Sequence, residues 1–220
     1  MIRRIRLSWL IGAVLFTSMA PRFFPWLLAF PYHAQAGQFE FWSEAPINQP
    51  RLDAIAADAV RRLQTSPLYV APEVRRVYLT SGGWRWTWLA LKMSDAFAFA
   101  PPVTGMIVIN RNSIDQDAVW NGKAIGRQRS LAGIIAHETC HDMERRHFGL
   151  WSDWTKSVWL REGYCDYVAQ ESSLSDADFA ALMKAGTSHP AIPYYLGRRR
   201  VAAALAANGG DVDALFAGPS

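Results

Sequence analysis

The chain has 220 residues, half of them hydrophobic, which suffices for one good core and leaves little for a second. It carries 23 Lys and Arg against 19 Asp and Glu, but four of these bases are arginines in the first 36 residues, which contain no acid. The remaining chain therefore balances 19 bases against 19 acids, and this neutral body excludes the basic groove expected of a nucleic-acid-binding protein.

The first 36 residues have the pattern of a membrane-targeting leader. Three arginines within the first six residues precede an uncharged apolar run over residues 7–20, and a second apolar stretch covers residues 23–30. As one span, residues 7–30 are long enough to cross a bilayer core of about 30 Å, which predicts a signal anchor. The alternative is a signal peptide cleaved after Ala36, where a small-x-small site ends.

Both kinds of leader place the rest of the chain on the same side of a membrane. Basic residues before an apolar run keep the N-terminus inside. The expected domain, residues 37–220, therefore faces the periplasm or the cell exterior. We favour the anchor, which predicts a single-pass protein of a bacterial inner membrane, whereas cleavage near Ala36 predicts a secreted protein.

The first part of the domain reads as one helix followed by a small twisted mixed sheet. Apolar residues recur at helical spacing over residues 51–65, and Pro67 follows. Strands are then predicted over residues 74–80, 84–91, 96–100 and 106–110. Three tryptophans alternate in the second of these, at positions 84, 86 and 88, and we interpret them as the buried side of a strand rather than a ligand-stacking face.

The second part of the domain reads as helical after a polar loop that contains Asn121-Gly122. Helices are predicted over residues 130–146, 158–170, 175–184 and 192–207, and Ser175 with Asp178 makes a capping box for the third. The sequence thus predicts the α+β class, with a single domain in which a small sheet precedes a helical half.

The segment His137-Glu138-Thr139-Cys140-His141 carries the clearest chemical pattern. Residues i and i+4 share a helical face, so the two histidines present their imidazoles to one ion, as Zn²⁺ coordination requires. Glu138 lies about 100° around the helix, where it can take a proton from a metal-bound water without being a ligand. This is the logic of a metallopeptidase, and we expect zinc as the cofactor and a peptide or protein as the substrate.

Glu162 is the expected third ligand, in Trp159-Leu160-Arg161-Glu162-Gly163. This element resembles the Trp-x-x-Glu-Gly motif of the gluzincin zinc metallopeptidases, the superfamily of the thermolysin-like and M1-type aminopeptidase families. The resemblance implies a zincin-like domain whose zinc is held by His137, His141 and Glu162. It also implies that Asp166, four residues on, orients a ligand histidine.

His147 is the rival third ligand, because His137, His141 and His147 reproduce the three-histidine spacing of the metzincins. Metzincins place a glycine three residues past the second histidine, where this chain has Glu144, a good helix former. A continuing helix turns His147 away from the metal, and Gly149 is the predicted helix stop. We therefore prefer Glu162 to His147.

The helix predicted over residues 192–207 resembles the Tyr-x-Lys-Gly helix of M1-type aminopeptidases, which implies that Tyr194 stabilises the oxyanion. Leu196 replaces the family lysine, and Tyr195 and His189 are alternative donors. The M1-type edge strand also carries a glutamate that binds the free amine of the substrate, whereas Gly105 to Asn110 contain no acid. We therefore expect an endopeptidase-like rather than an aminopeptidase activity.

Cys140 and Cys165 are the only cysteines, and we expect buried free thiols rather than a disulfide. A second function stays open, that of a non-catalytic, membrane-anchored interaction protein with a vestigial zinc site. Glu138 favours the enzyme, because a structural zinc site has no use for it. Nothing in the sequence indicates an oligomeric state.

Overall fold

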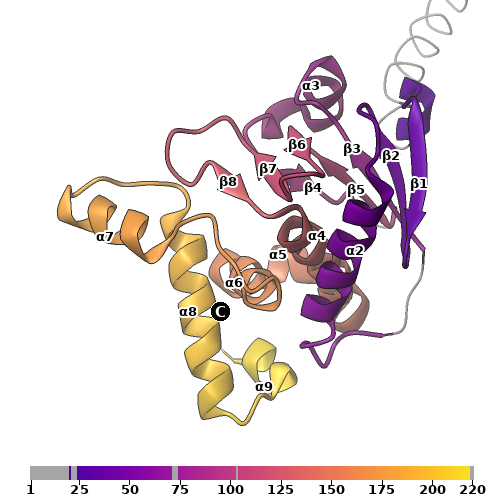
Figure 1. Cartoon of the computed structure of the whole chain (residues 1–220). Helices are drawn as coiled ribbons and strands as arrows, with labels where there is room; N and C mark the ends of the chain where they lie inside the picture. Colours follow the sequence, from indigo (N-terminus) through magenta and orange to yellow (C-terminus); the bar gives the residue numbers. More distant parts are fainter. Residues whose placement is uncertain (1–19, 21–23, 71–73, 103, 219–220) are drawn as a thin grey trace, which may run out of the picture.

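A computed structural model describes residue 20 and residues 24–70, 74–102 and 104–218. The chain is a single α+β domain with a mixed sheet and a helical half (Figure 1), as predicted. The five-stranded sheet has the order β1-β2-β3-β5-β4, in which β1–β2 and β4–β5 pair antiparallel and β2, β3 and β5 run parallel. Its strands are β1 (Tyr32–Ala36), β2 (Phe39–Ser43), β3 (Arg75–Leu79), β4 (Ala98–Phe99) and β5 (Met106–Ile109).

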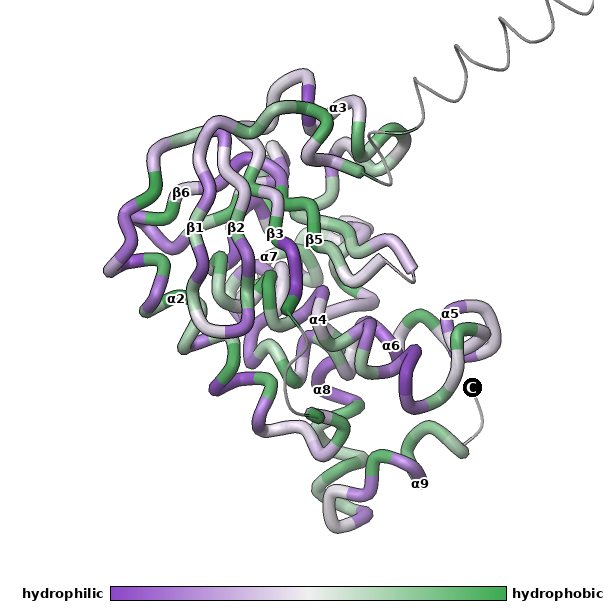
Figure 2. The backbone as a smooth tube through the Cα atoms, turned by 90° about the vertical axis from the view of Figure 1, so that its right-hand side faces the viewer, coloured by the Kyte–Doolittle hydropathy of each residue, from purple (hydrophilic) through white to green (hydrophobic). Residues whose placement is uncertain are grey.

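Helices cover both faces of this sheet. Alternate strand residues point to opposite faces, so each strand contributes side chains to two separate contacts. On one face, Val77 and Ile107 belong to the core shared with α2 (Gln49–Leu63) and α4 (Leu131–Phe148). On the other face, Tyr78 and Val108 pack with α3 (Trp84–Ala90). Figure 2 shows the strands side by side, with α4 below them and α3 at the upper end.

The helical half is built around two helices in close contact, α6 (Val158–Val168) and α8 (Ile192–Ala207). Its other helices are α5 (Ser152–Thr155), α7 (Asp176–Lys184) and α9 (Val212–Ala217). A second, three-stranded sheet leads into α4 and consists of β6 (Asn112–Ser113), β7 (Ala118–Trp120) and β8 (Gln128–Arg129).

The predicted helices are confirmed within a few residues at each end, and three boundary residues cap or end them. Ser130 caps α4 by accepting a hydrogen bond from the Gly133 amide at 2.9 Å, and Ser175 forms the predicted capping box of α7. α4 ends at Gly149, whose φ of 89° lies in the region that favours glycine.

The strand predicted over residues 84–91 is wrong, because this segment forms helix α3, followed by the 3-10 helix η2 (Leu91–Met93). Only Trp86 of its three tryptophans is buried, whereas Trp84 and Trp88 are 62% and 43% exposed. Positions i and i+4 share a helical face, so the two exposed rings point the same way. The alternation of tryptophans therefore did not indicate the secondary structure of this segment.

The leader predictions fall partly outside the described residues, since residues 1–19 and 21–23 are not among them. Among the described residues, no helix combines the length and apolar character needed to cross a membrane. Residues 25–28 form the 3-10 helix η1 (Pro25–Leu28) rather than the end of a long span, and Phe30 is buried against Tyr78.

The domain also starts earlier than the expected boundary between residues 36 and 37. That boundary falls at the end of β1, which pairs along its whole length with β2, and Ala36 is buried in the core. Cleavage after Ala36 would remove an edge strand of the sheet, because the small-x-small site forms the last three residues of β1.

Two glycines set the distance between α6 and α8. A Cβ added at Gly163 would lie 2.4 Å from the carbonyl carbon of Gly197, and one added at Gly197 would lie 2.5 Å from the carbonyl oxygen of Trp159. Both helices can approach this closely only because neither position carries a side chain. This contact fixes the position of α6 at Gly163, the residue that follows Glu162.

We predict that Gly163→Ala lowers the free energy of unfolding by about 1–3 kcal/mol or more, since a backbone contact has to open. Urea unfolding of the full chain measures the change. Gly218→Ala is the matched control, because its backbone is ordinary and the nearest atom to an added Cβ is 3.4 Å away. Equal stability of both variants would show that α6 and α8 do not depend on this approach.

Candidate metal centre

Helix α4 carries His137 and His141 one turn apart, deep in the protein. Both side chains are at most 10% exposed, because the helix runs between the sheet and α6 and is buried on most sides. Their Nε2 atoms lie 3.2 Å apart. The helical spacing thus brings the two imidazoles together as the sequence predicted.

Glu162 of α6 completes a group of three potential ligands with the two histidines. Its Oε2 atom lies 3.3 Å from Nε2 of His137 and 3.5 Å from Nε2 of His141. A tetrahedral ion with bonds of about 2.0–2.1 Å needs ligand atoms about 3.3–3.4 Å apart. The three atoms therefore have the spacing and the chemical identity of a zinc site with three protein ligands.

A carboxylate lies at the far nitrogen of each imidazole. Nδ1 of His137 is 2.9 Å from Oδ1 of Asp166, and Nδ1 of His141 is 3.3 Å from Oε2 of Glu144. A carboxylate at Nδ1 leaves Nε2 of each ring facing Glu162, where an ion would bind. Asp166 stands where the resemblance implied, whereas Glu144 was not recognised as a partner of His141, although its i+3 spacing from that histidine is a visible signal.

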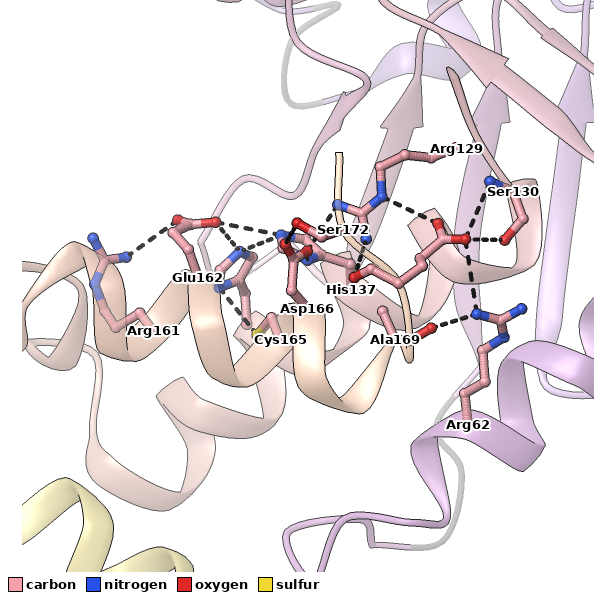
Figure 3. A network of polar contacts seen from close by, with 12 residues as sticks. Arg62, Arg129, Ser130, His137, Arg161, Glu162, Cys165, Asp166, Ala169 and Ser172 are labelled. Atoms are coloured by element: carbon pink, nitrogen blue, oxygen red, sulfur yellow. Dashed lines mark hydrogen bonds and ion pairs between the residues drawn. The ribbon is translucent and has the colours of Figure 1, made fainter. Parts of the chain in front are cut away.

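A buried arginine holds Asp166 in turn. The guanidinium of Arg129 lies 2.8 Å from Oδ1 of Asp166 and 3.1 Å from Oε1 of Glu171, and Ser172 donates a hydrogen bond to Oδ2 of Asp166 at 2.9 Å. Figure 3 shows this chain of contacts running from Glu162 through His137 and Asp166 to Arg129. Sequence reasoning missed Arg129 and Glu171, because no local pattern links β8 to the loop after α6.

The carboxylates favour positive charge between the two helices. Burial by itself would lower the pKa of both imidazoles, but the carboxylates outweigh it and raise the pKa of His137 and, further, that of His141. Burial would raise the pKa of Glu162, yet the two imidazoles hold it well below its usual range. A site of this kind suits a divalent cation, which supplies the same charge as the protons it displaces.

A cleft of about 710 Å³ opens onto these three residues, and its lining includes Glu138 and Tyr194. Glu138 is only 8% exposed. The other acids of the lining each have a basic partner, as in the pairs Asp95–Lys123 and Asp153–Arg145. Among the described residues, Glu138 has no hydrogen-bond or ion-pair partner, which leaves its carboxylate available in the cleft.

The structure distinguishes the three candidate donors near the start of α8. Tyr194 and His189 line the cleft, whereas the hydroxyl of Tyr195 donates to Asp176 at 2.6 Å and lies in a separate cluster with Leu182. Nδ1 of His189 accepts a hydrogen bond from the Ala191 amide at 3.2 Å. Burial, followed by the nearby Glu162 charge, raises the pKa of Tyr194, so its phenol stays protonated as a donor.

The strand at the rim of the cleft is β4, not the segment that the resemblance suggested. Met106–Ile109 form β5, which pairs with β3 on one side and with β4 on the other. Residues 96–102, which include β4, line the cleft. An extended ligand would therefore meet the outer edge of Ala98–Phe99.

His147 lies away from the group of three. α4 continues past His147, and Nε2 of His147 contacts Oδ1 of Asp213 at 2.6 Å on the surface. Cys140 and Cys165 are both free and buried, as expected. Together with Glu144 they form a second close group of potential ligands, adjoining Nδ1 of His141, which lies 3.5 Å from the sulfur of Cys165.

Comparison with known proteins identifies no relative. No protein-family model, no curated protein and no solved structure matches the chain.

We predict that the purified full chain binds about one equivalent of zinc, that Glu162→Ala loses it, and that His147→Ala retains it, because only Glu162 reaches the two histidines. Metal analysis of the dialysed proteins by mass spectrometry measures the content. Retention in Glu162→Ala together with loss in His147→Ala would transfer the third-ligand role to His147.

Proposed function

We propose that this protein is a zinc-dependent peptidase of the gluzincin type that hydrolyses peptide bonds in exported or membrane-associated substrates. One observation carries the proposal: the triangle of His137, His141 and Glu162 has tetrahedral spacing and lies in the same cleft as Glu138, an acid without a partner. A closed structural site would fill the fourth position with a protein ligand and would have no use for that acid.

The residues around the triangle divide the chemistry between them. A zinc ion held by His137, His141 and Glu162 would supply Lewis-acid polarisation and lower the pKa of water towards about 7. Glu138 accepts the proton from the attacking water and passes it to the leaving amine, as a general base and then a general acid. Tyr194 donates its O–H to the oxygen on which negative charge develops.

The cleft supports the cleavage of an extended chain rather than removal of a terminal residue. β4, the edge strand Ala98–Phe99, borders the cleft, and its outer backbone groups can pair with a substrate strand. M1-type aminopeptidases carry a glutamate for the substrate amine, whereas here the described lining acids other than Glu138 and Glu162 are Asp95 and Asp153, each paired with a base. We therefore propose an endopeptidase-like activity.

The N-terminal residues supply the proposed location. Three arginines before the uncharged run at residues 7–20 would hold the chain in a bacterial inner membrane with the domain facing the periplasm or exterior. Retention of the leader is consistent with β1, since cleavage after Ala36 would remove that strand.

We predict that Glu138→Gln keeps its zinc but lowers kcat by roughly 10²–10⁴-fold, since the amide cannot accept the proton. Hydrolysis of an internally quenched peptide library by the zinc-loaded full chain provides the assay. Glu40→Gln makes the same change on β2, outside the cleft, and should retain full activity. A fully active Glu138→Gln variant would remove the general base and, with it, the proposed mechanism.

Two neighbouring tyrosines allow a matched test of oxyanion stabilisation. We predict that Tyr194→Phe lowers kcat by roughly 10²–10³-fold with little change in KM. Tyr195→Phe removes a hydroxyl bonded to Asp176 outside the cleft, so it should cost about 1 kcal/mol of stability and leave kcat unchanged. The opposite pattern of kcat values would assign the donor to Tyr195.

A further inference from the structure

Helix α3 has a second apolar face in addition to the one that covers the sheet. Trp86 and Leu89 are buried against the sheet, whereas Trp84, Trp88 and Leu91 are 43–62% exposed. The two exposed rings of α3 follow at i and i+4, the spacing of a stripe on a single helical face, and Leu91 comes directly after the helix. A core-facing helix of a globular domain usually turns polar residues outward, so this stripe is unusual.

The stripe continues onto the 3-10 helix η1. Nε of Arg85 donates to the carbonyl oxygen of Leu28 at 2.8 Å, and its guanidinium lies 4.7 Å from the ring centre of Trp84. On η1, Trp26 and Leu27 are 40% and 56% exposed. In Figure 1 both elements lie at the upper end of the molecule, α3 by its label and η1 in indigo beside the grey trace. We call Trp26, Leu27, Trp84, Trp88 and Leu91 the tryptophan face.

We propose that the tryptophan face docks into the headgroup region of a lipid bilayer. Tryptophan prefers this region, because its ring is apolar and its N–H is polar. Leucine side chains beside it add apolar area that can be buried just below the headgroups. Arg76 and Arg85 at its base are each paired with a glutamate, so the docking rests on the apolar area and the indole N–H groups rather than on charge.

The place of this face along the chain indicates lipid rather than a protein partner. The uncharged apolar run of residues 7–20 ends four residues before Phe24, and the Phe24 amide donates to the carbonyl oxygen of Ala20 at 2.9 Å. η1 begins at the next residue, Pro25. The tryptophan face thus lies where the chain passes from its most apolar sequence into the folded domain.

Docking would also set the position of the cleft. Met93, at the end of η2, and Asp95 line it, so the cleft opens next to the tryptophan face. If the cleft cleaves peptides, as proposed above, its substrates would be chain segments close to a membrane surface. That consequence rests on the proposed function, whereas the docking itself does not, and its test needs no activity.

The test uses tryptophan quenching by lipid. The full chain is reconstituted into vesicles of phosphatidylcholine with anionic phosphatidylglycerol, made with or without brominated acyl chains that quench nearby indoles. Two double variants are compared with the wild type. Trp84→Ser/Trp88→Ser removes two rings of the tryptophan face, and Trp151→Ser/Trp154→Ser removes two rings near α5 that are 75% and 70% exposed.

The two variants should change the signal in opposite directions. Each removes two of ten tryptophans. The fraction of emission quenched by brominated lipid is expected to fall in Trp84→Ser/Trp88→Ser, which loses quenched rings. It should rise in Trp151→Ser/Trp154→Ser, which loses unquenched ones, because α5 lies well below α3 in both views.

An unchanged or higher quenched fraction in Trp84→Ser/Trp88→Ser would overturn the proposal and leave the face to a protein partner. A chain that does not sediment with the vesicles would overturn it as well. If the double variant melts early, the single variant Trp84→Ser carries the same test, since that ring is the most exposed of α3. Loss of peptidase activity with quenching intact would contradict only the proposed function.

Discussion

The arrangement of the domain depends on the contact between α4 and α6, where two imidazoles of one helix meet two carboxylates of the other. His137 lies between Glu162 and Asp166, and Asp166 is fixed by the buried guanidinium of Arg129. Buried charges are stable only when each has a partner, so these contacts specify how the helices face each other. The glycine contact behind α6 then lets α8 bring Tyr194 to the same cleft.

The sequence predicted the parts of this site that follow from local spacing. The interval of four residues placed His137 and His141 together, and a helix former at Glu144 kept His147 on the surface. Arg129 and Glu171 could not be found in this way, since their roles arise only when β8 and the loop after α6 meet in space. Short-range periodicity carries information about a helical face, but none about which distant segment packs against it.

The error at α3 has a physical cause of the same kind. Tryptophans at every second position match the two-residue period of a strand. In the helix, however, only Trp86 lies in the core, whereas Trp84 and Trp88 are exposed. Inferring a secondary-structure period from one residue type assumes that all residues of that type are buried. That assumption fails where an apolar surface is exposed, so the incorrect prediction and the tryptophan face have one origin.

Glu138 differs from the neighbouring acids, which are each held by a partner. Glu162 and Asp166 have imidazole or guanidinium partners, Glu144 lies against His141, and Asp153 is bound by Arg145. A carboxylate fixed in this way is a poor proton carrier, because each transfer must break an ion pair. Glu138 is buried at the cleft and, among the described residues, has no such pair to break. The same network that brings His137, His141 and Glu162 together therefore leaves one acid among the described lining residues of the cleft without an ion pair.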